Sequence, residues 1–166
     1  TPFPIVPGVM VPAGIYDHKE AQIVFYTNRS APLSLSIDSI IGGFFGGERV
    51  SLKPTLRYRI GESFSSELSW DYNDISLPVQ NGDFRADLGR LRLTYSFTPR
   101  IALQTLLQYN QRDELLATNL RFSWVQSANA GFFIVYNEVD DDRFGAPTKP
   151  RRELIIKYSR IFDVLR

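Results

Sequence analysis

The sequence has no cysteine and contains a single histidine and a single methionine. Without cysteine, a disulfide framework, thiolate chemistry and a thiol-ligated metal site are excluded. No stretch approaches the ~20 consecutive apolar residues of a membrane helix. The opening TPFPIVPGVMVPAG is too often interrupted by proline to be the core of a signal peptide. Because residue 1 is Thr, we expect the numbering to begin on a processed protein or on a piece of a longer one.

Neither sign of charge is in excess, because the net charge is only +1. That balance excludes the basic footprint of a nucleic-acid binder. Lysine is rare among the cations, with four Lys against fifteen Arg, and 43% of the residues are hydrophobic. Arginine is favoured where charges are partly buried and held by several hydrogen bonds, so an enclosed polar surface is indicated. The length suits one domain, 1–166, with a proline-rich lead-in over 1–15.

Helical periodicity is almost absent, whereas alternation of apolar and polar residues recurs along the chain. The segment VSLKPTLRYRI is followed by a Gly61-Glu62 turn and then by SSELSWDYN, which predicts an antiparallel pair. The whole pattern predicts an all-β fold with nine strands, at about 18–28, 32–41, 49–60, 63–73, 85–97, 100–110, 117–126, 131–138 and 151–162.

Alternation divides these strands into two faces, because successive side chains of a strand point to opposite sides. Basic residues of one strand face acidic residues of the next, so Arg57 and Arg59 are expected to pair with Glu67, Asp71 or both. The polar set comprises Arg49, Lys53, Arg57, Arg59, Glu67, Asp71, Arg90, Arg92, Gln104, Gln108 and Arg121. The apolar set comprises Leu56, Tyr58, Leu68, Trp70, Tyr72, Leu91, Leu93, Tyr95, Phe97 and Trp124.

This alternation is compatible with two architectures. In a soluble, ligand-binding barrel the apolar face points inward, whereas in a membrane barrel it meets lipid and the interior is polar. Aromatic residues gather at strand ends and the polar face is poor in lysine, which favours the membrane barrel. The connections RSAP, GE, TP and SANA are short, GGFFGGE, DISLPVQNGDF and VDDDRFGAPTKP are long, and QRDELLA is intermediate. Short turns on one side and long loops on the other predict a periplasmic and an extracellular end.

Several segments together carry a resemblance to a known family. They are PAGIYD (12–17), GGFFGGERVSLKPTLRYR (42–59), SLPVQNGDF (76–84), RLRLTYSFTPRIALQTLLQYN (90–110), ATNLRFSWVQSANAGFFIVYNE (117–138) and RELIIKYSRIF (152–162). The chain resembles bacterial outer-membrane proteins of unassigned function, which typically carry an N-terminal domain similar to family-nine carbohydrate-binding modules ahead of a C-terminal barrel. The resemblance implies an antiparallel transmembrane β-barrel in the bacterial outer membrane, in contact with lipid and lipopolysaccharide. PVQNG at 78–82 departs from the family's usual proline-glycine turn.

Strand parity adds an expectation of its own. Nine strands place the chain ends on opposite sides of a membrane, whereas single-chain bacterial barrels usually have an even number. Either residues 3–14 supply a tenth strand, or the chain is part of a larger barrel completed by another protein chain. Proline is poorly tolerated inside a paired strand, and Pro4, Pro7 and Pro12 therefore favour the second alternative.

Catalytic and metal sites have few candidates. His18 is the only histidine, and its neighbours indicate an exposed strand start rather than a Ser-His enzyme. A glycosidase would use two of Glu67, Asp71, Asp74 and Asp83, although all four also fit a structural network with arginines. The acidic run Glu138, Asp140, Asp141 and Asp142 is a weak candidate for a hard cation and lacks the spacing of a calcium loop.

The sequence therefore predicts a structural role. We expect an anchor, scaffold or conduit for a partner or exported domain, without a cofactor. A carbohydrate-active enzyme or glycan-binding component of the outer membrane and a soluble ligand-binding barrel are the alternatives.

Overall fold

The computed structural model describes residues 1–127, 130–141 and 149–160, and this part of the chain contains strands and no helix. Within these ranges no helix has the length and apolar character to cross a membrane. The predicted all-β class is confirmed. The strands of the large sheet are β3 (Glu20–Tyr26), β4 (Leu33–Phe44), β5 (Gly47–Ile60), β6 (Phe64–Ser76), β7 (Phe84–Thr98), β8 (Ile101–Asn110), β9 (Leu115–Ser127), β10 (Ala130–Asp141) and β11 (Arg151–Arg160).

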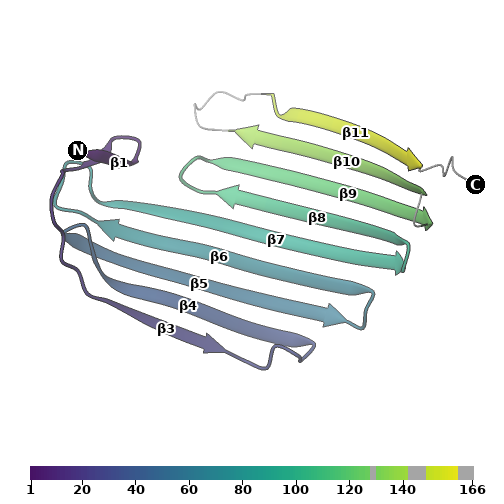
Figure 1. Cartoon of the computed structure of the whole chain (residues 1–166), viewed down its shortest axis with the longest axis horizontal. Helices are drawn as coiled ribbons and strands as arrows, with labels where there is room; N and C mark the ends of the chain where they lie inside the picture. The colour runs from purple at the N-terminus through teal and green to yellow at the C-terminus, as the bar shows by residue number, and fades with distance from the viewer. Residues whose placement is uncertain (128–129, 142–148, 161–166) are drawn as a thin grey trace, which may run out of the picture.

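These nine strands form one antiparallel sheet in the order in which they occur in the sequence (Figure 1). Each strand pairs with its sequence neighbours, so the sheet is a simple meander with β3 and β11 at its edges. The described sheet is open, and closure into a barrel is not observed. Because every neighbouring pair is antiparallel, β3 and β11 run in the same direction.

The connection between β4 and β5 corrects one prediction. GGFFGGE was expected to be a long loop, but the strands continue through it and only Phe45 and Gly46 form the turn. Their φ values are 48° and 81°, in the left-handed region of a two-residue hairpin turn. Such turns match the right-handed twist of paired strands, so the glycines here allow a tight hairpin. The link between β3 and β4, over 27–32, is longer than the predicted RSAP.

The sheet has two ends that differ in their connections (Figure 1). We call the end with the connections 27–32, 61–63 and 99–100, where β9 ends and β10 begins, the turn end. The opposite end, with the connections 45–46, 77–83 and 111–114, where β10 ends and β11 begins, is the loop end. The predicted asymmetry of lengths holds only in part: 77–83 is the longest connection of the large sheet with all of its residues described, but 45–46 is a two-residue turn and the turn-end connection 27–32 is longer than 111–114. The predicted long connection VDDDRFGAPTKP lies largely outside the described residues.

Residues 3–11 form a separate hairpin of β1 (Phe3–Val6) and β2 (Val9–Val11) at the loop end (Figure 1). The tenth strand considered for 3–14 is not part of the large sheet, because β1 and β2 pair with each other. Gly8, at φ 86°, follows Pro7 in the turn, and Pro12 directly follows β2. Proline lacks the donor needed to continue a ladder, which explains why these strands are short.

The buried hydrophobic core of the described residues lies under this hairpin. Val9 and Val11 of β2 are 2% and 1% exposed, and they cluster with Ile75 of β6 and Leu77 of the following loop. Phe45 of the β4–β5 turn contributes an edge-on contact with Phe3, with ring centroids 5.3 Å apart. In contrast, most apolar side chains of the large sheet are exposed or half-buried.

Candidate functional site

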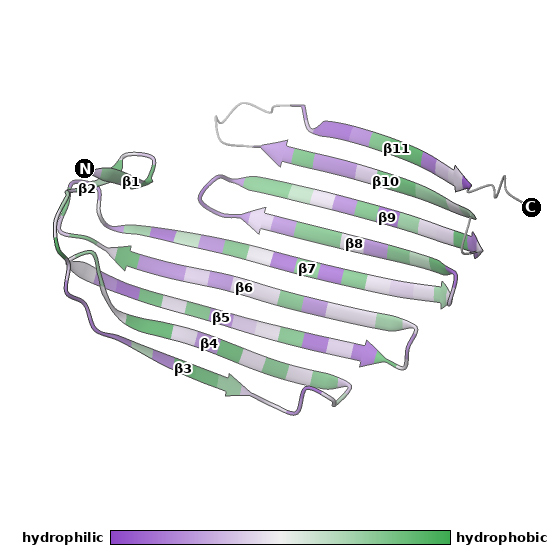
Figure 2. Ribbon diagram, in the orientation of Figure 1, coloured by the Kyte–Doolittle hydropathy of each residue, from purple (hydrophilic) through white to green (hydrophobic). Residues whose placement is uncertain are grey.

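The register of the large sheet sorts its side chains into two faces, because antiparallel partners lie on the same side. Arg57 of β5 lies opposite Glu67 of β6, which lies opposite Arg92 of β7. One position along, Leu56 lies opposite Leu68, and Leu68 opposite Leu91. Figure 2 shows the resulting alternation of polar and apolar residues along the strands.

The two predicted residue sets fall on opposite faces of this register. The polar face carries Arg49, Lys53, Arg57, Arg59, Glu67, Asp71, Arg90, Arg92, Gln104, Gln108 and Arg121. The apolar face carries Leu56, Tyr58, Leu68, Trp70, Tyr72, Leu91, Leu93, Tyr95, Phe97 and Trp124. What each face meets, lipid or an interior, stays a prediction.

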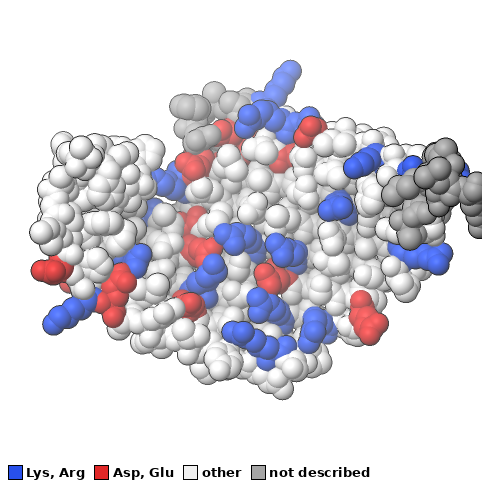
Figure 3. Space-filling view, viewed as in Figure 1, with Lys and Arg blue, Asp and Glu red and all other residues white. Residues whose placement is uncertain are grey.

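Charges on the polar face are interleaved rather than separated by sign (Figure 3). Asp71 of β6 bridges two strands, since Lys53 Nζ and Arg90 Nη2 lie 3.1 and 3.3 Å from its carboxylate oxygens. Arg57 Nε donates to Glu67 at 2.7 Å, as predicted from the sequence. These pairs tie β5, β6 and β7 together across the sheet.

Arg59 does not form the carboxylate pair that was expected for it. Its Nη2 donates instead to the backbone carbonyl of Ser30 in the β3–β4 connection, at 3.2 Å. The sequence pattern missed this contact because the acceptor is a backbone carbonyl of a connection, and side-chain alternation along the strands does not describe such an acceptor. Arg49, near the loop end, pairs with Glu20 of the edge strand β3.

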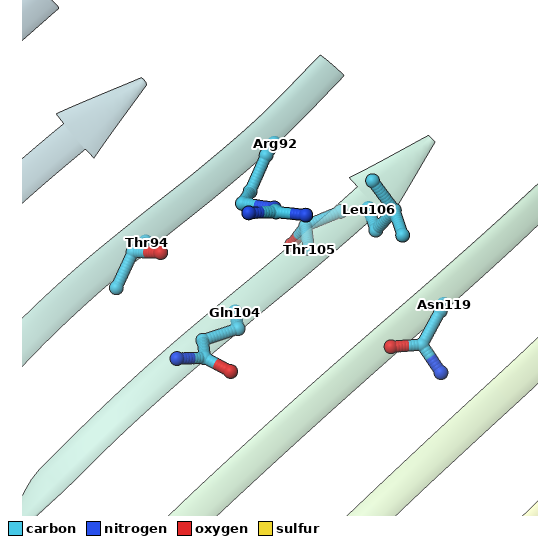
Figure 4. A pocket seen from close by; sticks show the side chains of 6 residues that line it. All are labelled: Arg92, Thr94, Gln104, Thr105, Leu106 and Asn119. Atoms are coloured by element: carbon cyan, nitrogen blue, oxygen red, sulfur yellow. The ribbon is translucent and has the colours of Figure 1, made fainter. Parts of the chain in front are cut away.

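Hollows of the sheet open on the polar face. One of about 270 Å³ is lined by Arg92, Thr94, Gln104, Thr105, Leu106 and Asn119, and Figure 4 shows Arg92 extending toward the strand that carries Gln104 and Leu106. A second, of about 260 Å³, is lined by Arg57, Arg59, Ser65, Ser66, Glu67 and Arg92. Two further hollows lie near Asp71 and near Arg121. Thr94 and Asn119 were not among the predicted site residues, although each alternates in phase with a predicted arginine.

Exposed apolar side chains cover the middle of the apolar face, and aromatic residues border them at both ends. Leu56 and Leu68 are 40% and 47% exposed. One group comprises Tyr72 and Tyr109 toward the loop end, with Trp70 and Tyr136 near the middle of β6 and β10. The other lies toward the turn end and comprises Tyr58, Phe64, Tyr95, Phe97, Trp124, Phe132 and Tyr158. We call these two groups the loop-end and turn-end aromatic rows.

Among the described residues, charged side chains of the apolar face gather beyond the loop-end aromatic row, and Arg160 lies on the same face at the turn end of β11. The Tyr136 hydroxyl donates to Glu138 at 2.6 Å, and Arg152 of β11 pairs with the same carboxylate at 2.9 Å. Arg85 forms an ion pair with Asp87, which is only 2% exposed. Along β10, apolar side chains thus give way to the aromatic ring of Tyr136 and then to the ion pair of Glu138.

The candidate catalytic carboxylates do not converge. Asp74 lies on the apolar face, opposite Val50 and Arg85, whereas Glu67 and Asp71 lie on the polar face. Glu67 and Asp71 are four positions apart on β6, so their Cα atoms are about 13 Å apart along the strand. Asp83 accepts a hydrogen bond from the Ser76 hydroxyl. His18 is exposed and precedes β3.

The acidic run is divided as well. Glu138 and Asp140 lie on the apolar face, Asp141 lies on the polar face, and Asp142 lies outside the described residues. The described part of the chain contains no group of three or more His, Asp or Glu side chains placed to hold a metal ion.

These observations define an all-β protein whose large antiparallel sheet has one charged, hollowed face and one apolar face. Comparisons with known protein families, with curated proteins and with solved structures find no match to this chain. The residues themselves are therefore the basis for an interpretation of function.

Proposed function

We propose that the sheet is part of the wall of a bacterial outer-membrane β-barrel, which serves as an anchor, scaffold or conduit for a partner or exported domain. The observation that carries this proposal is the apolar face with its two aromatic rows. Outer-membrane barrels present such a band to lipid, with aromatic girdles at both interfaces.

The height of the apolar band supports the proposal. On β5, apolar-face side chains run from Val50 to Ile60, which corresponds to about 33 Å along the strand. At the ~40° tilt of barrel strands this distance spans about 25 Å across a membrane, the height of the apolar band of outer-membrane barrels. The ion pairs beyond the loop-end row would lie at the level of the lipid headgroups and lipopolysaccharide.

The location of the hollows favours the membrane barrel over a soluble one. A soluble ligand-binding barrel would enclose its apolar face, so its cavities would be lined by leucine and aromatic residues. Here the hollows are lined mainly by polar-face residues such as Arg92, Gln104 and Asp71. A polar interior is the expected arrangement in a membrane barrel.

The free edges indicate what the complete barrel needs. Exposed apolar side chains occur on both sides of β3, at Ile23 and Val24, and on both sides of β11, at Ile155 and Ile156. Unpaired edges are avoided in lipid because every backbone group must find a partner. Since β3 and β11 are parallel to each other, antiparallel closure requires an odd number of additional strands. We expect another protein chain or another segment to supply them.

Arginine substitutions at two adjacent positions of β7 test this proposal. Leu93 lies on the apolar face between the aromatic rows, and Thr94 lies on the polar face. Leu93→Arg should destabilise the membrane-inserted protein by about 2–4 kcal/mol, the cost of arginine near the bilayer midplane. Thr94→Arg adds the same charge on the polar side and should cost less than about 1 kcal/mol.

The measurement is urea-dependent folding into lipid vesicles, with heat-modifiable gel migration as the readout of the folded form. Outer-membrane fractionation of the wild-type protein is the accompanying control. Equal losses for the two variants, or recovery of the wild-type protein in the soluble fraction, would contradict the assignment of lipid to the apolar face.

A further inference from the structure

The cations of the polar face are neutralised unevenly. Toward the loop end, Lys53 and Arg90 share the carboxylate of Asp71, and Arg49 pairs with Glu20. Toward the turn end, strands β5–β9 carry four arginines on this face. We call them the turn-end arginine cluster, which comprises Arg57, Arg59, Arg92 and Arg121.

In the turn-end half of these strands, only one described carboxylate lies on the polar face with this cluster. It is Glu67, and it is bound to Arg57 at 2.7 Å. Arg59 reaches a backbone carbonyl, and Arg121 lies over the ring of Phe133 at 5.7 Å. Among the described residues, Arg92 has neither an ion-pair nor a hydrogen-bond partner.

Arg92 also stands where two hollows meet. It lines the hollow that contains Arg57 and Arg59 and, on its other side, the hollow that contains Thr94, Gln104 and Asn119 (Figure 4). Hydroxyl and amide groups therefore flank the unpaired guanidinium. The volumes of about 260 and 270 Å³ lie just below those of typical ligand pockets, ~300–1,000 Å³, and suit a small solute.

We propose that the turn-end arginine cluster binds a small solute carrying an oxyanion, a phosphate or a carboxylate, with Arg92 as its central contact. The inference rests on the proposed function in one respect, since it takes the polar face as the lining of an enclosed interior. Enclosed cations need counter-charges because desolvation penalises an unpaired charge. The planar guanidinium fork is the side-chain group best matched to a phosphate or carboxylate.

The neutral groups around Arg92 add shape to the site. Thr94 and Gln104 lie opposite each other on β7 and β8, and Gln104 lies opposite Arg121 on β9. The row of Arg59, Ser65, Thr94, Gln104 and Arg121 thus crosses five adjacent strands. At ~4.8 Å per strand, it places hydrogen-bonding groups over about 19 Å. A bound solute would have its charged group at Arg92 and its neutral polar groups at Thr94, Gln104 or Asn119.

Equilibrium binding to the full chain, folded in detergent micelles at low ionic strength, tests this inference. The probes are inorganic pyrophosphate and citrate, measured by isothermal titration calorimetry. Arg92→Gln should weaken binding about tenfold, the effect of losing a hydrogen bond to a charged group. Arg100→Gln is the matched control, because it removes the same charge from the β7–β8 connection, where Arg100 donates to the carbonyl of Gln126 at 3.2 Å.

The binding of the two probes shows whether the site prefers a phosphate or a carboxylate, and the two variants show whether Arg92 is the contact. Binding of one probe alone identifies the preferred oxyanion, and binding of both supports a general oxyanion site, provided that Arg92→Gln weakens it and Arg100→Gln does not. Binding should also fall as salt rises. The inference is overturned if neither probe binds the wild-type chain or if the two variants behave alike.

A second variant covers the case in which Arg92→Gln does not fold. Arg121→Gln removes a cation from the other side of Gln104 and should weaken binding by a smaller factor, with the same control. The assay in micelles does not require insertion into a bilayer. A chain that inserts but binds no probe would overturn this inference alone, and a chain that binds but stays out of membranes would overturn the proposed function.

Discussion

Truncation of Val11 offers a direct test of how the N-terminal hairpin is held. The side chain is 1% exposed and packs in the cluster with Ile75 and Leu77. Val11→Ala removes two methyl groups, which at about 0.8 kcal/mol each, with a cavity contribution, gives a loss of about 2–3 kcal/mol. Because this cluster attaches the hairpin to the sheet, the population with a detached hairpin should rise about 30- to 150-fold.

Native-state hydrogen exchange of the hairpin amides measures this change. The adjacent Met10 provides the control, because its side chain is 53% exposed and Met10→Ala should change exchange little. We expect faster exchange in residues 3–11 of the Val11→Ala variant and unchanged exchange in the central strands. Similar exchange rates in both variants would refute the view that buried packing, rather than the β1–β2 ladder, holds the hairpin in place.

Three other substitutions test separate features of the sheet. Asp71→Asn removes the carboxylate that two cations share and should lower the free energy of unfolding in urea by about 1–2 kcal/mol; no loss would mean that the bridge is without energetic effect. At Gly89, an added Cβ would lie 2.8 Å from the ring of Trp70, so Gly89→Ala should displace the ring. In a background without the second tryptophan, unchanged fluorescence of Trp70 would contradict this packing. Gly46→Ala places a side chain at φ 81°, beside Phe45 at φ 48°, and should cost about 1 kcal/mol in the same urea titration, whereas a stabilised variant would argue against the left-handed turn.

The strands of the large sheet could be predicted because their signal is local. Each strand alternates with period two, and the same alternation assigns faces once the strands pair in order. For this reason the sequence could predict that Arg57 and Arg59 face Glu67, Asp71 or both, and the structure pairs Arg57 with Glu67. Strand ends were less predictable, as the GGFFGGE segment illustrates. Four glycines are typical of a loop, but two residues with positive φ are sufficient for the turn.

Alternation along the sequence could predict neither the N-terminal hairpin nor whether the edges of the sheet are paired. The prolines of residues 3–14 argued correctly against a strand of the main sheet, but they gave no sign of a hairpin that packs on Ile75 and Leu77. That contact joins segments more than sixty residues apart, and its signal is tertiary. The state of the edge strands β3 and β11 is a matter of contacts between distant segments or chains, and period-two alternation within residues 20–160 carries no signal for such contacts.

The packing of the N-terminal hairpin on the sheet affects the order in which the strands unfold. Its contacts come from Phe44 and Phe45 of the first loop-end turn, from Ile75 and Leu77 around the end of β6, and from Phe84 at the start of β7. The hairpin therefore packs across the loop end of four consecutive strands, β4 to β7. We expect these four strands to unfold as a single cooperative unit. The described parts of β8 to β11 contain no comparable buried cluster. We therefore expect unravelling to begin at β11 and to progress strand by strand toward β8, and strands β4 to β7 to open last.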